Sequence, residues 1–218
     1  CENSHAWGFM TAIAVDKTAD VEVVGAYTEY PERAEAFHKD FGVYMMKSYD
    51  ELVGQVDGIL ITARDGKNHY KYAKPYIESG IPMFIDKPIT CTEEDAKAFM
   101  DELKAHNVPV TGGSVCALAD YVQELKKAVQ EGTYGKVYGG FVRAPFSPDA
   151  QYGGFYFYSQ HLVQMFGEVF GYRPKSVRAC QVGGQVSCII RYEGFDVSAV
   201  YLDHSGAYYA AVSFPKEV

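Results

Sequence analysis

One lysine of this sequence stands directly between an aspartate and a proline. In the stretch MFIDKPIT, residues 83–90, an apolar run leads straight to Asp86, Lys87 and Pro88. A lysine removed from water has a lowered pKa, so it can exchange a proton with the hydroxyl group of a small molecule. Pro88 restricts Lys87 to extended geometry and permits a cis bond, which favours one direction for the side chain. The alternative interpretation is a solvated lysine at a strand end, with proline as a breaker.

A histidine in the second half of the chain is another candidate for proton transfer. His161 lies in YSQHLVQM, shortly after the glycine pair Gly153 and Gly154. Histidine is the side chain that most often acts as a general base near neutral pH. A lone histidine on a helix is also commonly a packing residue, and the residues alone leave both interpretations open.

The elements that must position Lys87 alternate between apolar strands and helices. We expect helices at residues 4–15, 31–42, 69–80 and 91–107, and strands at 21–27, 43–46, 56–62, 81–86 and 108–113. Asn3 or Ser4 is a suitable N-cap for the first helix, and Thr90 with Glu93 resembles a capping box. Continuous apolar strands alternating with helices are typical of a parallel α/β sheet. The sequence therefore predicts a Rossmann-like doubly wound domain over residues 1–114.

The pattern changes near residue 115. Helices are expected at 119–132 and 158–171, a half-exposed strand at 135–146, and four further strands after residue 175 that are separated by glycine turns. Such runs indicate an α+β domain over residues 115–218 with a mostly antiparallel open sheet. No strand precedes the first helix and the chain stops just after a strand. We therefore expect the first strand of the first domain and a C-terminal part of the second to be missing.

Composition excludes several classes of function. The chain has 28 acidic and 20 basic residues, a net charge of −8, and no clustered basic face for nucleic acid. It shows neither an apolar run long enough to span a membrane nor a signal peptide. The cysteines form no CxxC pair and no metal-like spacing with the histidines, so no metal is expected, and reduced thiols favour a cytoplasmic location. These cysteines are Cys1, Cys91, Cys116, Cys180 and Cys188.

The order of these landmarks resembles the Gfo/Idh/MocA family of nicotinamide-dependent oxidoreductases. Its usual E-K-P motif stands here as Asp86-Lys87-Pro88, and the glycine turn before the second domain as residues 132–135. The resemblance implies a Rossmann domain that binds NAD or NADP. It also implies a second domain that forms the substrate cleft and commonly a homodimer or higher homo-oligomer. Carried over residue by residue, the catalytic roles fall to Lys87 and His161.

The resemblance also implies a set of cofactor-binding residues. The phosphate turn would be residues 1–5, and Glu29 would favour NAD, although Arg33 leaves NADP open. The complete set is Asn3, Ser4, His5, Thr28, Glu29, Thr62, His69, Asp86, Lys87 and Pro88.

Two features depart from the family pattern. Phe157 stands four residues before His161, where the family has an aspartate, and the phosphate turn has no glycine before Gly8. The leading hypothesis is an oxidoreductase that transfers a hydride between a nicotinamide cofactor and a hydroxylated small molecule such as a sugar or polyol. The alternatives are a noncatalytic dinucleotide- or sugar-binding protein on the same fold, or a relative that cleaves glycosidic bonds with tightly held NAD. A small-molecule substrate is expected, with neither a nucleic-acid nor a membrane partner.

Overall fold

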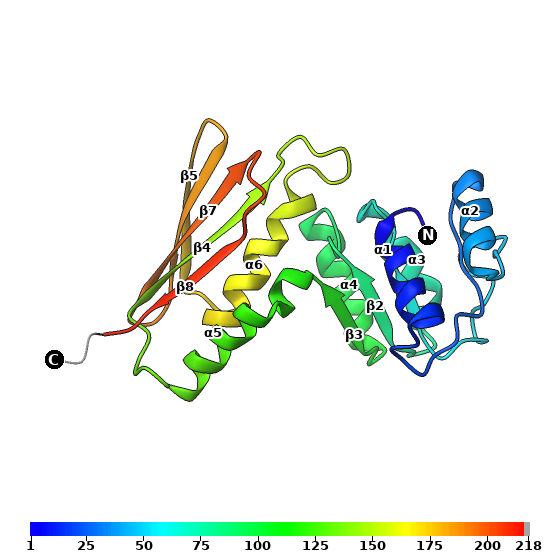
Figure 1. The fold of residues 1–218 in the computed structure, drawn as a ribbon, viewed down its shortest axis with the longest axis horizontal. Coiled ribbons are helices and arrows are strands. Elements are labelled where there is room, and N and C mark those ends of the chain that lie inside the picture. The colour runs from blue at the N-terminus through cyan, green and yellow to red at the C-terminus, as the bar shows by residue number, and fades with distance from the viewer. Residues whose placement is uncertain (216–218) are drawn as a thin grey trace. The chain divides into compact units, whose positions relative to one another are not determined.

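The computed structural model describes residues 1–215, which form two compact units (Figure 1). The first unit comprises Cys1–Gly113 and the second Ser114–Val218. Each unit has its own hydrophobic core. The two units are described separately below.

A parallel sheet organises the first unit. Strands β1 (Ile59–Ile61), β2 (Met83–Asp86) and β3 (Val110–Gly113) are hydrogen-bonded in that order, and both pairs are parallel. Helices α3 (Lys67–Ile77) and α4 (Glu93–Ala105) provide the crossovers between the strands. The predicted Rossmann-like parallel architecture is therefore confirmed.

The first two helices form a smaller apolar cluster of their own. Helix α1 (Ser4–Met10) continues into a π-helical turn over Thr11–Val15, and Asn3 caps its start as predicted. Helix α2 (Pro31–Phe41) has proline in its first turn and ends at Gly42, whose φ of 68° is the left-handed conformation that glycine adopts readily. The cluster consists of Ala6, Met10, Phe37 and Val43.

The strands expected at residues 21–27 and 43–46 are not formed. The described residues contain a single parallel bridge there, between Ala26 and Met45. A strand is stabilised by lateral pairing along its length, and here the apolar Val21 and Val24 are 57% and 49% exposed. The next strand is also shorter than predicted: β1 has three residues, and its Leu60 is 48% exposed instead of buried.

One helix prediction needs correction. The cap of α4 is Thr92, whose hydroxyl accepts from the Asp95 N–H at 3.1 Å, whereas Thr90 only donates to the Thr92 carbonyl. Both threonines have an acidic residue three positions later, so the sequence pattern alone does not separate them. Helix α3 contains Pro75 and continues through it, because its buried side chains hold that face against the sheet core.

The second unit is a five-stranded sheet with helices on one face. The strand order is β5 (Ser176–Val182), β6 (Gln185–Arg191), β7 (Asp196–Asp203), β4 (Gly139–Phe146) and β8 (Tyr209–Ser213). Every neighbouring pair is antiparallel except β4 with β7, which confirms the mostly antiparallel sheet. Of the four strands expected after residue 175, only β5, β6 and β7 pair with one another in chain order. Strand β8 pairs with β4 instead, because β4 inserts next to β7 as the fourth strand of the sheet.

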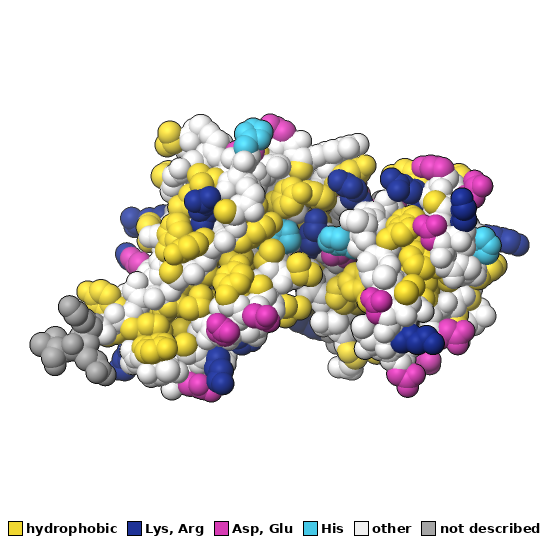
Figure 2. Space-filling model, in the orientation of Figure 1, with side chains coloured by type: hydrophobic (Ala, Val, Ile, Leu, Met, Phe, Trp, Pro, Cys, Tyr) yellow, Lys and Arg dark blue, Asp and Glu magenta, His cyan; other side chains and the backbone are white. Residues whose placement is uncertain are grey.

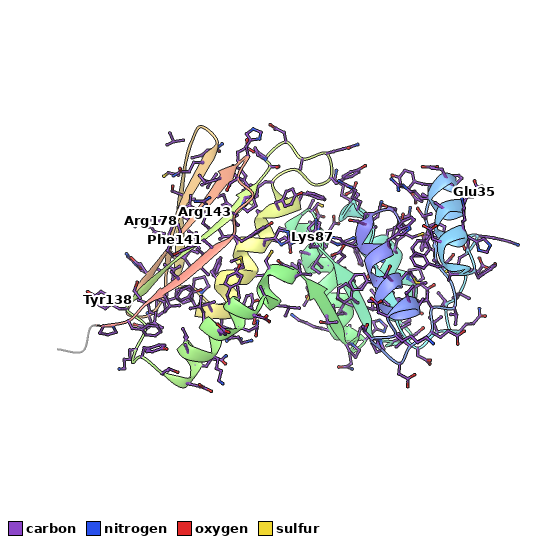
Figure 3. All side chains as sticks on the ribbon, in the orientation of Figure 1. Glu35, Lys87, Tyr138, Phe141, Arg143 and Arg178 are labelled. Atoms are coloured by element: carbon purple, nitrogen blue, oxygen red, sulfur yellow. The ribbon has the colours of Figure 1, made fainter. Side chains whose placement is uncertain are left out.

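Helices α5 (Asp120–Glu131) and α6 (Tyr156–Phe170) cover one face of this sheet, as Figure 1 shows. Strand β4 alternates, so that Val142, Ala144 and Phe146 are buried in the core. Gly140 is required here, because a Cβ atom at this position would lie 2.2 Å from the Phe170 ring. Among residues 1–215, no helix covers the opposite face of the sheet. Phe141, Arg143 and Arg178 of that sheet are labelled in Figure 3.

Candidate functional site

Lys87 lies at the carboxyl end of β2, the central strand of the first unit (Figure 3). The strand is buried except for the half-buried Phe84, Lys87 is half-buried and Pro88 is buried. The peptide bond between Lys87 and Pro88 is cis, as the sequence permitted. Ligands of open α/β sheets bind outside the carboxyl ends of the strands. The lysine therefore stands at the edge where chemistry is expected.

The carboxylate of Asp86 is held by the start of helix α1. Asp86 is 4% exposed, and its Oδ2 lies 2.6 Å from Nδ1 of His5, whose N–H donates to it. The side chain of His5 is 41% exposed. This contact bridges 81 positions of the sequence, and no local pattern predicted it.

The first residues of the chain are fastened to the loop after β1. The side chain of Asn3 accepts from the N–H groups of His5 and Ala6, and its Nδ2 donates to the Thr62 carbonyl at 3.0 Å. Within the described residues, the N–H groups of Asn3 and Ser4 form no hydrogen bond. Two unsatisfied donors at a helix start are suited to an anion such as a diphosphate. This part of the site therefore fits a dinucleotide.

His69 is a buried residue of α3 with one unpartnered nitrogen. Its Nε2–H donates to the Ala63 carbonyl at 2.8 Å, and burial lowers the pKa of the imidazole, which keeps the ring neutral. Its Nδ1 is a buried acceptor without a hydrogen-bond partner in the described part of the chain. The histidine thus holds the loop after β1, and its Nδ1 remains as an unpaired hydrogen-bond acceptor in the described residues.

Glu29 is paired with a lysine that the sequence did not suggest. Its carboxylate lies 2.9 Å from Nζ of Lys71, which lowers the pKa of Glu29 and raises the pKa of Lys71. The ammonium group also lies over the rings of Tyr49 and Tyr72, at 5.5 and 5.3 Å. The neighbouring Thr28 hydroxyl accepts from the Tyr30 N–H at 3.3 Å. Lys71, on α3, is therefore the cation beside the predicted ribose carboxylate.

His161 occupies a buried position in the second unit. It lies on α6, is 5% exposed, and its Nδ1 is 2.5 Å from Oγ of Ser114. The ring of Tyr208 meets it edge-on at a centroid distance of 5.6 Å. Phe157, one turn earlier on α6, is 7% exposed and packs against aromatic rings. The imidazole therefore has a serine as its partner, which sequence reasoning missed because Ser114 lies 47 positions away.

Comparison with known proteins matches the first unit to a family. Residues 8–114 match the model of the Gfo/Idh/MocA oxidoreductases, which is described as an oxidoreductase family with an NAD-binding Rossmann fold. The match covers nearly the whole of the first unit. The resemblance that Asp86-Lys87-Pro88 suggested is thereby confirmed.

Individual relatives are similar at a lower level. An uncharacterized oxidoreductase of Streptococcus pneumoniae serotype 4 (strain ATCC BAA-334 / TIGR4) is 28% identical over 109 residues, which are 49% of this chain and 29% of that protein. The glucose-6-phosphate 3-dehydrogenase of Bacillus subtilis (strain 168) is 26% identical over 126 residues, which are 58% of this chain and 36% of that protein. The chain thus spans about a third of the length of these curated relatives.

A solved structure supports the fold over both units. The apo scyllo-inositol dehydrogenase of Lactobacillus casei superposes with a TM-score of 0.77 at 15% identity, covering 93% of this chain and 67% of that one. Among residues 1–215, no helix is long and apolar enough to cross a membrane. The same residues contain no group of three or more His, Cys, Asp or Glu side chains that could hold a metal ion.

Proposed function

We propose that the protein is a nicotinamide-dependent oxidoreductase that acts on a hydroxyl group of a sugar or polyol. The observation that carries this proposal is the position of Lys87, half-buried at the carboxyl end of the central strand of a Gfo/Idh/MocA Rossmann unit. The names of the relatives support the substrate class, since they include a sugar-phosphate dehydrogenase and an inositol dehydrogenase.

The first unit supplies residues that would hold the dinucleotide. The free N–H groups of Asn3 and Ser4 would donate to its diphosphate. Glu29 would accept from ribose hydroxyls, as a carboxylate near this position does in NAD-binding folds, while Lys71 would pair with the 2′-phosphate of NADP. The bound nicotinamide would supply the acceptor or donor of the hydride.

The chain's own residues would manage the proton of the substrate hydroxyl. The amine of Lys87 would take this proton when the alcohol is oxidised and return it in the reverse direction. His161, in the second unit, would form a hydrogen bond with a hydroxyl group of the substrate. Asp86 would position the start of α1 through His5 without entering the reaction.

The proposal is tested by titrating NADH and NADPH into the full-length protein while the emission of Trp7 is followed. Trp7 lies one turn into α1, where its Nε1–H donates to Asp40 at 2.8 Å. We expect saturable quenching. NADH should bind more tightly than NADPH if Glu29 determines the cofactor preference, and NADPH should bind more tightly if Lys71 does. No response to either cofactor, confirmed by calorimetry, would overturn the proposal.

The second candidate is a noncatalytic binding protein on the same fold, and Phe157 favours it. A buried phenylalanine can neither orient an imidazole nor bind a hydroxyl, and it takes the position of the family aspartate. This candidate predicts that a sugar or dinucleotide binds while no cofactor is reduced across a panel of sugars and polyols.

We also propose a homodimer formed through the uncovered sheet face of the second unit. Phe141 and Tyr209 lie side by side there, at a ring distance of 5.9 Å. In the described residues, Nε of Arg143 is buried without a hydrogen-bond partner, which is costly in a surface that stays uncovered. A band of hydrophobic side chains is visible on the same unit in Figure 2. The free cysteines support a cytoplasmic location for this assembly.

A further inference from the structure

The side chain of Lys71 is held from two sides within the first unit. Its ammonium group lies 2.9 Å from Oε1 of Glu29, which comes from a loop 42 positions earlier in the chain. It also lies over the rings of Tyr49 and Tyr72, at 5.5 and 5.3 Å from their centroids. These two rings contact each other and the ring of Tyr27. Because aromatic faces attract a cation, the rings favour the position in which the ammonium meets the Glu29 carboxylate.

The hydroxyl of Tyr72 is an unpaired donor beside the same carboxylate. Tyr72 is 9% exposed, and its hydroxyl forms no hydrogen bond in the described residues. Burial, and after it the Glu29 carboxylate, raise the pKa of the phenol, so the hydroxyl keeps its proton at neutral pH. A buried donor without a partner is costly, and a ligand that accepts from it removes this cost. The side chains of Glu29 and Lys71 are 43% and 49% exposed, so they can turn toward a ligand and open the hydroxyl to it.

This cluster adjoins the residues proposed to hold the dinucleotide. The Cys1 thiol contacts the Tyr27 carbonyl at 3.7 Å, so the start of the proposed phosphate turn and the chain leading to Glu29 are neighbours in space. In Rossmann folds a carboxylate about 20 residues after the phosphate turn accepts from the adenosine ribose. Glu29 follows residues 1–5 at roughly that distance, so Lys71 and Tyr72 lie beside the proposed ribose position.

The 2′ position of this ribose distinguishes NAD from NADP. A hydroxyl both donates and accepts, so adjacent ribose hydroxyls can donate to Glu29 and accept from Tyr72 at the same time. A 2′-phosphate brings acceptors and negative charge, which the Glu29 carboxylate repels. Lys71 can offset that charge only by leaving Glu29, and Lys74, one turn further along α3, is itself paired with Glu102 at 3.1 Å. The arrangement therefore fits the ribose of NAD.

We propose that Tyr72 and Lys71 are specificity-determining residues that commit the cofactor site to NAD. Tyr72 donates to a ribose hydroxyl, and Lys71 is a positioning residue that holds the Glu29 carboxylate for the same ribose. The two uses of Lys71, as the partner of Glu29 and as the partner of a 2′-phosphate, exclude each other, and the aromatic rings favour the first. This inference rests on the proposed oxidoreductase function.

The test compares the dissociation constants of NADH and NADPH for the full-length protein and its variants, measured by isothermal titration calorimetry. The wild type should bind NADH at least about tenfold more tightly, because the 2′-phosphate meets a like charge. Tyr72→Phe removes only the hydroxyl and should weaken NADH by about 2–10-fold, and NADPH less. The ratio of the two constants is the readout, since a purely structural loss would weaken both cofactors alike.

Variants of the ion pair separate the two uses of Lys71. Lys71→Met should weaken NADH by about 2–5-fold, and Lys71→Arg should restore it, because a guanidinium also pairs with a carboxylate. Glu29→Gln should reverse the preference, since it removes the like charge and frees Lys71 for the phosphate. The control is Tyr70→Phe, a tyrosine of α3 whose ring stacks on Phe99, and it should change neither constant.

Three outcomes would overturn the inference while the oxidoreductase proposal stands. The first is a wild type that binds NADPH as tightly as NADH or more tightly. The second is a Lys71→Met variant that weakens only NADPH, because the lysine would then serve the 2′-phosphate. The third is a Tyr72→Phe variant with unchanged affinity for NADH. Binding of neither cofactor would instead remove the proposed function, and this inference with it.

Discussion

At the residue scale, the important polar side chains obtain their partners from distant parts of the chain. Asp86 is bound by His5, Glu29 by Lys71, and His161 by Ser114. The energetic value of these contacts differs. The pair of Glu29 and Lys71 is nearly half-exposed on both sides, so solvent screens it and it contributes no more than about 1 kcal/mol. The other two involve a buried partner, and losing a partner there leaves a desolvated polar group.

Replacing Lys87 by methionine separates chemistry from cofactor binding. Methionine keeps the apolar length of the side chain and removes the amine that exchanges the proton. Steady-state turnover should fall by about 10²–10⁴-fold, the usual contribution of general acid–base catalysis. The dissociation constant of NADH, from Trp7 emission, should stay within about threefold, because acid–base contributions belong to the chemical step. Lys97→Met, an exposed lysine of α4, is the matched control, and unchanged turnover in Lys87→Met would contradict the assignment.

At the element scale, the N-terminal caps of helices α1 and α4 fix the loops that follow strands β1 and β2. Helix α1 begins at the side-chain cap of Asn3, which also ties it to the loop after β1. The N-cap of helix α4 is Thr92, six residues after the end of β2. The loop that carries Lys87 is therefore bounded on one side by a buried strand and on the other by a capped helix.

A pair of threonine variants tests which residue caps α4. Thr92→Ala removes the oxygen that accepts from the Asp95 N–H, so the free energy of unfolding should fall by about 1 kcal/mol. Thr90→Ala is the control and should lower the free energy of unfolding by only about 0.3 kcal/mol, because the Thr90 hydroxyl donates to a carbonyl and caps no N–H group. Urea denaturation followed by circular dichroism measures both. Equal losses, or a larger one for Thr90→Ala, would restore the capping box at Thr90 and Glu93.

At the scale of the whole molecule, the uncovered sheet face of the second unit is the feature that a monomer does not explain. Phe141, Tyr209 and the unsatisfied Nε of Arg143 gather on it. A sheet with one bare face buries little apolar surface there, and a second copy would cover it.

A charged residue in this face should break the proposed dimer. Sedimentation velocity of the wild type should give the mass of a dimer, and Phe141→Glu should give a monomer, because the interface would then bury an unpaired carboxylate. Met100→Glu, at a 46% exposed position on α4, serves as the control and should remain dimeric. A wild type that sediments as a monomer, or a dimeric Phe141→Glu, would refute the interface.

Local patterns predicted the elements whose stability is local. The helices predicted over 31–42 and 119–132 end at glycines in the left-handed conformation, as their sequences indicate. The reason is local, because glycine itself adopts a positive φ at little cost. The carboxyl end of β2 and the alternation in β4 were also readable, since burial repeats with the period of a strand. The family motif placed Lys87 correctly at the strand end, although its role stays a prediction.

By itself the sequence determined the parallel first unit, the mostly antiparallel second unit and the position of Lys87 at a strand end. Only the tertiary structure decided which apolar runs become strands, since residues 21–27 pair through one bridge and β4 inserts beside β7. It also decided the polar partners, among them Ser114 for His161 and His5 for Asp86. The physical reason is the same in both cases: strand pairing and side-chain hydrogen bonds depend on which segments meet in space, whereas helix caps and burial periods depend on neighbours in the chain.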